Sequence, residues 1–297
     1  METQLQHSKL KRATIGDYLI ALFCVLVILI CILPMVTLLA RSLSDPGLLI
    51  RNEIALLPKG FTLNAYQTIL SDARYVRSLI WTAILTVMCT ILSMFMTTIA
   101  SFPLIYDHLK GRRVINFIFL FTMYFGAGTI PTYLVLKELN LIGSPLVLML
   151  PYCLSVFNLI IMRSFLFGIP DSLRESAEID GAGPIRILIK IYLPLSTSVI
   201  ATLSLFYAVG RWNGYSDALM FMSRNRDYYP IQYLLYNIIN VSASFETALT
   251  EGTSSTQGLS ETFKAASVMF ATVPILMIYP WLQRYFITGV TIGAEKG

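Results

Sequence analysis

The chain has 297 residues, of which 56% are hydrophobic and only 13% are charged, and its mean hydropathy is +0.68. These values exclude a soluble globular domain and indicate a protein embedded in a lipid bilayer. The net charge of +5 does not indicate nucleic acid, because no basic run alternates with aromatic residues; basic residues that anchor cytoplasmic loops explain it.

Apolar blocks along the chain predict six transmembrane helices and therefore an all-α membrane protein. A cytoplasmic tail is expected at 1–17, a transmembrane domain at 18–290 and a second cytoplasmic tail at 291–297. The first span is predicted to be kinked near Pro34 and to stay uncleaved, since it has full span length and no cleavage site follows. The six predicted spans cover 18–40, 78–105, 114–136, 144–167, 195–210 and 263–290.

The connecting segments predict the orientation of the chain. Long external loops are expected at 41–77, with a short helix near 65–70, and at 223–262, and a re-entrant or interfacial turn at 218–222. The short turn at 106–113 holds three basic residues and the link at 137–143 holds one. Because short basic loops stay in the cytoplasm, both termini are predicted to lie inside.

Several spans contain residues that interrupt an apolar helix. The glycines between Tyr124 and Pro131 are expected to break the third span where protein or a water-filled cavity satisfies the freed backbone groups. Asn158 either lines a pathway or hydrogen-bonds to a neighbouring helix. Arg163 is expected to extend toward the inner headgroups.

The longest charged interruption runs from Pro170 to Pro194. A helix should start just after Pro170, with Ser172 and Glu175 forming a capping box. Gly181 and Gly183 should then form a sharp turn, and Pro184 suits the first turn of a second helix. On these grounds alone, an ordinary interfacial helical hairpin remains open.

This segment resembles the EAA motif of bacterial ABC importer permeases, in which E-A-A-x-x-D-G-A is followed by L-P. Two positions depart from the pattern: Ser176 replaces the first alanine, and Ser198 stands where many relatives have a second proline, so the bend of the following span stays open. The resemblance implies a MetI-like ABC type I importer fold with a cytoplasmic coupling helix that docks on the ATPase. The matching coupling positions are Glu175, Ser176, Ala177, Asp180, Gly181, Ala182 and Pro194.

The resemblance extends to 144–170, 206–214 and 288–297, which look like the MalG-like subunit of carbohydrate importers. It implies residence in the bacterial cytoplasmic (inner) membrane and import of an oligosaccharide by alternating access. The substrate group that it suggests includes acidic, alginate-type sugars. The implied partners are a second permease subunit in a heterodimer, two ATP-binding subunits and an extracytoplasmic solute-binding protein.

The sequence contains no residues for chemistry of its own. It has no phosphate-binding G-x-x-x-x-G-K-[ST] loop and no His/Cys/Glu set with the spacing of metal ligands, and its four cysteines lie in apolar blocks. The chain is therefore predicted to be neither an enzyme nor a cofactor-binding protein, with ATP and Mg used by partner subunits. Two alternatives stay open: a structural or sensory subunit that docks a soluble partner without moving solute, and a channel.

A sugar path should combine aromatic faces with amides and hydroxyls. Arg211 could make a bidentate contact to a uronate. The competing interpretation is an aromatic belt with Arg211 extending to the headgroups, and the maltose relative implies that most sugar contacts lie on the partner subunit. The predicted path residues are Tyr124, Tyr152, Asn158, Arg211, Trp212, Asn213 and Tyr215.

Overall fold

The protein is described by a computed structural model covering residues 15–51, 53–222, 225–248 and 261–278. Helices and loops make up these residues, without a strand among them, so the predicted all-α class is confirmed. Among the described residues, three helices are long and apolar enough to span a membrane, and there are up to six spans if each of three bent helix pairs counts as one. The predicted tail at 291–297 and most of the one at 1–17 lie outside the described residues.

The described chain divides into two units, which are considered separately. The first unit holds α1 (Ile15–Ser42), α2 (Pro46–Ile50) and the start of α3 (Asn64–Ser71). Helix α1 starts earlier than the expected residue 18 and continues through Pro34, and α3 matches the short helix predicted near 65–70. Asp45 caps α2 by accepting from the backbone N–H of Gly47 at 2.8 Å.

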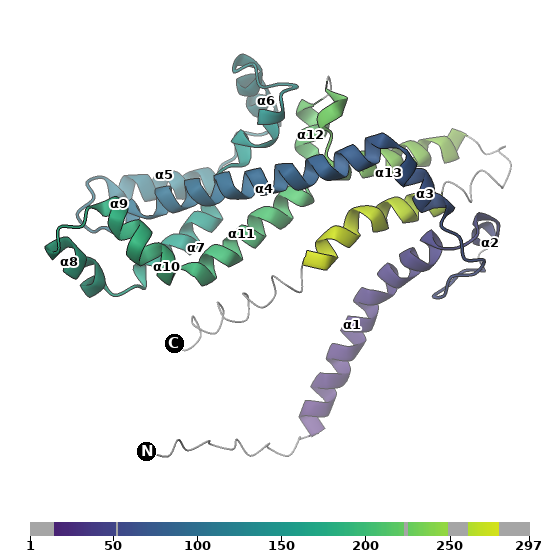
Figure 1. The fold of residues 1–297 in the computed structure, drawn as a ribbon, viewed down its shortest axis with the longest axis horizontal. Helices are drawn as coiled ribbons and strands as arrows, with labels where there is room; N and C mark the ends of the chain where they lie inside the picture. Colours follow the sequence, from purple (N-terminus) through teal and green to yellow (C-terminus); the bar gives the residue numbers. More distant parts are fainter. Residues whose placement is uncertain (1–14, 52, 223–224, 249–260, 279–297) are drawn as a thin grey trace. The chain divides into compact units, whose positions relative to one another are not determined.

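The second unit is built on α4 (Ala73–Ser101), which runs alongside α7 (Val156–Phe167) and α11 (Thr197–Trp212), as Figure 1 shows. One face of α4 carries small and polar residues at helical spacing, and this face is buried. Small side chains allow close approach of neighbouring helices inside a membrane, while the opposite face of α4 exposes large apolar side chains. The buried face consists of Ser78, Thr82, Leu85, Thr86, Cys89, Ser93, Thr97 and Ser101.

Two predicted spans are broken helices in the structure. The third consists of α5 (Arg112–Tyr124) and α6 (Thr129–Glu138), bent by 114°, so the predicted break is confirmed. Pro131 lies in the first turn of α6, where proline is tolerated, so the glycines of 126–128 separate the helices.

The fourth predicted span is only partly α-helical. Two 3-10 helices, η2 (Pro145–Leu148) and η3 (Leu150–Tyr152), precede α7 at an angle of 46°. Ser155 caps α7 by accepting from the backbone N–H of Asn158 at 3.4 Å. The second predicted span also differs, because Asp72 caps α4 and the helix starts at Ala73, before the expected residue 78. It ends at Ser101, and η1 (Pro103–Ile105) follows.

The prediction of an external loop over 223–262 is wrong for most of its described residues. They contain η5 (Arg226–Tyr228) and the helix α13 (Ile231–Ala248), which packs against α4. The hydroxyl of Thr82 accepts from the backbone N–H of Ile231 at 2.8 Å and holds the start of α13. A final helix covers Glu261–Ile278. Parts of the predicted loop and of the predicted last span lie outside the described residues, namely 223–224, 249–260 and 279–290.

Candidate functional site

The charged element starts with α8 (Asp171–Ile179), immediately after Pro170 as predicted. The predicted capping box is wrong. Pro170 occupies the N-cap position, Ser172 lies inside the helix, and no side chain caps its start. Glu175 extends outward instead, and its contact with the Arg174 guanidinium is a long 4.0 Å.

The turn after α8 follows the glycine prediction. Gly181 has a φ of +76°, a conformation that side chains disfavour. Its N–H donates to Glu178 O at 3.0 Å, and the Ala182 N–H donates to Ala177 O at 2.9 Å. These two bonds form a Schellman motif, which closes α8 and reverses the chain. Pro184 then opens α9 (Pro184–Ile187) at its first position, as expected.

The chain bends between α9 and α11, although Ser198 stands where many relatives have a second proline. A π-helical turn, η4 (Leu188–Tyr192), leads into α10 (Leu193–Leu195), and α11 then leaves at 84°. Pro194 has no N–H to donate, and π turns and prolines are recognised causes of helix bending. The bend therefore exists without a second proline.

The inner face of α8 is attached to the bundle by packing. Ala177 and Ala182 contact a cluster of buried residues, here called the α8-end cluster, which contains side chains from the ends of three long helices. The members of this cluster are Phe102, Ile105, Met162, Leu166, Ile187, Tyr192, Val199 and Leu203.

Arg174 is the second attachment of α8. Its guanidinium pairs with Asp171 at 3.2 Å and Glu178 at 3.0 Å. The same guanidinium lies 5.2 Å from the centroid of the Tyr106 ring, in cation–π geometry. Burial raises the pKa of the Tyr106 hydroxyl, so the ring stays neutral, and it packs edge-on against Phe102 of the α8-end cluster.

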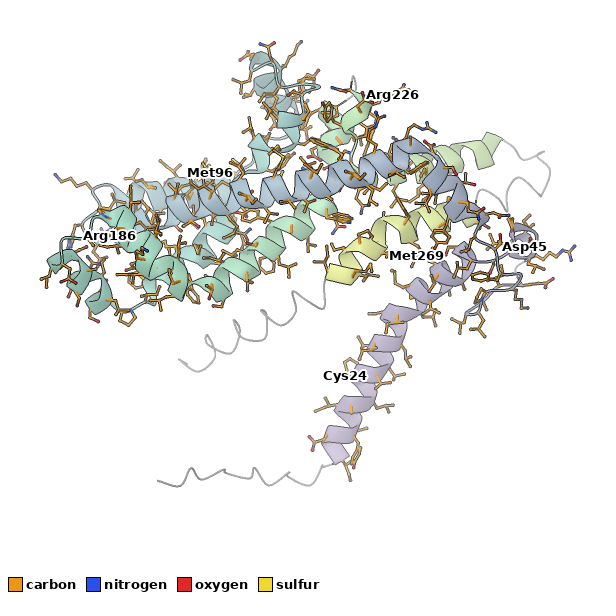
Figure 2. All side chains as sticks on the ribbon, viewed as in Figure 1. Cys24, Asp45, Met96, Arg186, Arg226 and Met269 are labelled. Atoms are coloured by element: carbon orange, nitrogen blue, oxygen red, sulfur yellow. The ribbon has the colours of Figure 1, made fainter. Side chains whose placement is uncertain are left out.

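The outer face of α8 is free of contacts that would cover it within the described chain. Ile179 is 88% exposed, and Ser176 and Asp180 are exposed as well; on α9, Ile185 is 75% exposed. Exposed isoleucines bordered by carboxylates mark a candidate interaction surface. Figure 2 shows Arg186 at this end of the second unit, away from Arg226.

A cavity of about 910 Å³ lies further along the same helices. Its walls come from α4, α7 and α11, from η3, and from the start of α12 (Ser216–Phe221). Apolar side chains such as Phe157, Leu205 and Phe206 form part of the lining, and polar groups form the rest. The polar and charged residues at the cavity are Ser93, Tyr152, Ser155, Asn158, Tyr207, Arg211, Ser216 and Asp217.

Arg211 and Asp217 form a buried ion pair at this cavity. Their side chains are only 7% and 4% exposed. Arg211 Nη1 donates to Asp217 Oδ2 at 2.5 Å and to Leu148 O at 2.9 Å; Nη2 donates to Asp217 Oδ1 at 3.1 Å and to Gly214 O at 3.2 Å. The pair thus joins the end of α11 to η2 and α12.

The structure brings together three of the predicted path residues, since Tyr152, Asn158 and Arg211 all line the cavity. The predicted availability of Arg211 for a bidentate contact to a uronate is wrong, because Asp217 already occupies both terminal nitrogens. Its predicted alternative, extension to the headgroups, is wrong as well, because the side chain is buried.

The other four predicted residues do not line the cavity. Tyr124 is 75% exposed at the end of α5, and Asn213 follows the last residue of α11. Tyr215 stacks on Tyr236 at 5.0 Å. Trp212 is buried and its Nε1–H donates to Ala271 O at 3.1 Å, so neither cavity nor aromatic belt describes it.

Sequence reasoning missed Asp217, Tyr207, Ser155 and Ser93. Asp217 had a usable signal, since a carboxylate next to an apolar block in a membrane protein is a site candidate. Tyr207 had none: its hydroxyl lies 2.7 Å from Thr97 Oγ1 and accepts from Ser155 N–H at 3.1 Å, contacts between distant segments. Among the described residues, no group of three His, Cys, Asp or Glu could hold a metal, and all four cysteines are free.

Comparison with known proteins adds independent findings. The family model for "Binding-protein-dependent transport system inner membrane component" matches residues 80–292. The chain is 39% identical to the polygalacturonan/rhamnogalacturonan transport system permease protein YtcP of Bacillus subtilis (strain 168), over 95% of this chain and 98% of that protein. It is 25% identical to the arabinooligosaccharides transport system permease protein AraQ of Halalkalibacterium halodurans, over 97% and 100% of the two chains.

A solved structure is similar as well. A chain from the crystal structure of a bacterial ABC transporter involved in the import of the acidic polysaccharide alginate matches with a TM-score of 0.81 and 30% identity. The match covers 92% of this chain and 99% of that one.

Proposed function

Because the chain belongs to the family of binding-protein-dependent transport system inner membrane components, we propose that it is the permease subunit of an ATP-driven ABC importer for an oligosaccharide. Its substrate class follows the relatives, whose names include polygalacturonan, rhamnogalacturonan and arabinooligosaccharides, and the alginate importer that it resembles in structure. Acidic, alginate-type sugars are the finer proposal within that class.

One structural observation supports this function above the others: the same three helices reach both candidate sites. Phe102, which caps the end of α4, joins Met162 of α7 and Val199 of α11 in the α8-end cluster. Further along, the same helices contribute Ser93, Asn158 and Tyr207 to the cavity. On α4 the two positions lie about 14 Å apart along the axis, at 1.5 Å per residue. Movement of α8 therefore has a continuous packed route to the cavity wall.

The proposed mechanism is alternating access. ATP and Mg bind two partner ATPases, whose closure draws the coupling helix α8 with it. The Schellman turn and the packing of Ala177 and Ala182 make α8 stiff enough to transmit that motion. Glu175, Ser176, Asp180, Gly181 and Pro194 complete the proposed coupling element. An extracytoplasmic binding protein delivers the sugar to the cavity, which a second permease subunit completes.

The cavity suits a sugar chemically. Sugars offer apolar ring faces and many hydroxyls, which match Tyr152 and Phe157 on the one hand and Asn158 and Ser155 on the other. A cavity of about 910 Å³ has the size of a small-molecule site.

The direct test is uptake by the complete importer in proteoliposomes, with oligogalacturonate, oligoalginate and arabinooligosaccharide as probes. The expected result is ATP-dependent accumulation of at least one of them, with ATPase activity stimulated by the loaded binding protein. A structural or sensory subunit would give partner binding without accumulation, and a channel would give flux without ATP. Either result would overturn the proposal.

The proposed orientation places the 106–113 turn and α8 in the cytoplasm and η5 outside. Single cysteines replacing the exposed Lys110 and Arg226, in a background without the four native cysteines, should react with an impermeant thiol reagent from opposite sides. Reaction of both from the same side would contradict this orientation.

A further inference from the structure

Charge is scarce around the cavity. Among the described residues that line it, Arg211 and Asp217 are the only two of the types Asp, Glu, Lys, Arg and His, and they pair with each other. The described wall therefore has no net charge, although relatives of this chain carry the names of acidic sugars. How an anionic substrate is recognised then depends on whether the guanidinium is accessible.

The guanidinium has no accessible donor left for a ligand. A guanidinium has five N–H donors. Four of those of Arg211 go to Asp217, Leu148 O and Gly214 O. The fifth, on Nε, is buried and has no partner within the described part of the chain. A substrate carboxylate could reach Arg211 only by displacing Asp217, which would leave that carboxylate buried and unpaired, a costly arrangement.

Asp217 works against an anion at this wall as well. It lies at the cavity with its side chain only 4% exposed. Its negative charge cancels that of the Arg211 guanidinium, so a second carboxylate nearby finds no net positive charge. The ion pair therefore cannot serve as the carboxylate-binding group of the importer.

Asn158 offers the opposite chemistry. Asn158 lies in the first turn of α7, lines the cavity and is only 5% exposed. Its side-chain amide makes no hydrogen bond to any residue that the structure describes. One amide presents two donors and a carbonyl acceptor, which matches sugar hydroxyls that both donate and accept.

We infer that the cavity wall of this subunit is a subsite for uncharged sugar hydroxyls, in which Asn158 determines specificity and the Arg211–Asp217 pair only positions the wall. The inference rests on the proposed sugar path and deepens it. The carboxylates of an acidic substrate are met elsewhere, on the partner permease or in solvent.

The test compares oligogalacturonate with its methyl ester, two probes that share a sugar backbone and differ in charge. Uptake of both probes is measured with the complete importer and the same binding protein. For each probe, the uptake rate of a variant is divided by the uptake rate of wild type. This ratio cancels the selectivity of the binding protein. The variants are Asn158→Ala, the double replacement Arg211→Met with Asp217→Leu, and the control Asn116→Ala, which lies on α5 away from the cavity.

The expected result for Asn158→Ala is a loss of uptake by the same factor for acid and ester, between about twofold and tenfold, the worth of a neutral hydrogen bond. The double variant removes both charges together, so it leaves no unpaired charge that would unfold the protein. Its acid-to-ester ratio should stay within about twofold of wild type, and Asn116→Ala should match wild type for both probes.

One outcome would contradict only this inference, and another would contradict the proposed sugar path as well. If the double variant lowers uptake of the acid about tenfold more than that of the ester, Arg211 binds the carboxylate and the inference is wrong. If Asn158→Ala lowers neither uptake, the sugar does not touch this wall, and the proposed sugar path is wrong as well.

Discussion

Arg174 lies on α8 and Arg211 lies at the cavity, and the ion pairs of these two arginines differ in exposure. Each guanidinium bonds to carboxylates a few residues further along or back in the chain. The acidic partners of Arg174 are 74% and 43% exposed, whereas Asp217 is 4% exposed. Exposed pairs contribute about 0–1 kcal/mol and exchange partners easily, while breaking a buried pair costs several times more.

This difference separates the tasks of the two ends. At α8, rigidity comes from the backbone turn and from Ala177 and Ala182 on the α8-end cluster, so the surrounding acidic side chains remain able to rearrange. At the cavity, rigidity comes from the ion pair itself. Substitutions that remove charge should therefore affect stability at the cavity and coupling at α8.

The largest expected effect is loss of one member of the buried pair. Asp217→Ala leaves the Arg211 guanidinium unpaired and should lower the free energy of unfolding by about 3–5 kcal/mol. Arg211→Met combined with Asp217→Leu should cost much less, because no charge stays buried alone. Thermal unfolding of the purified complex measures both; equal losses in the single and double variants would show that the pair is not a stability element.

A smaller loss is expected at Gly214, where the chain approaches Arg211 closely. A Cβ on this residue would lie 2.6 Å from Arg211 Nη2 and 3.1 Å from its Cζ. Gly214→Ala should therefore displace the guanidinium and cost about 1–3 kcal/mol, as overpacking does.

Gly210→Ala is the matched control for Gly214→Ala, since a Cβ there meets nothing within 4 Å. Its unfolding temperature should be close to that of wild type. If Gly214→Ala were equally harmless, the ion pair would tolerate displacement and the contrast between the two ends would weaken.

The turn after α8 should show a conformational cost of about 1 kcal/mol. Gly181 has a φ of +76°, yet a Cβ there meets nothing within 4 Å, so Gly181→Ala is strained by its backbone and not by crowding. Gly183, with a φ of −73°, is the matched control. Gly181→Ala should lower uptake per ATP hydrolysed, whereas Gly183→Ala should not; identical behaviour would argue against the turn as a coupling element.

The smallest stability effect is expected for Arg174→Gln, under about 1 kcal/mol, because its ion pairs are partly exposed. Loss of its contacts to Tyr106 and the neighbouring acids should nevertheless loosen α8 and lower the uptake obtained per ATP. Arg77→Gln, which breaks the exposed pair with Asp227 far along the chain, is the control. Equal coupling in the two variants would contradict the role of Arg174.

The sequence predicts a region well when its structure depends on residues that are close together in the chain. The helix after Pro170, the glycine turn and the helix starting at Pro184 were predicted correctly, because proline and glycine restrict the backbone within a few residues. The capping box failed because Ser172 lies inside the helix that Pro170 begins. Helix α13 was assigned to a loop because the polar residues after 240 obscured the apolar run at its start.

Composition and spacing alone therefore determined the membrane class, the break in the third span and the helical hairpin after Pro170, since these depend on hydrophobicity and on backbone geometry near each residue. The tertiary structure decided which polar residues meet. Arg211 could have faced substrate, headgroups or a partner, and only the packing of α11 against η2 and α12 placed Asp217 and Leu148 O around it. Long-range pairing of this kind leaves no local signal, because each partner residue is also found in ordinary loops and helix ends.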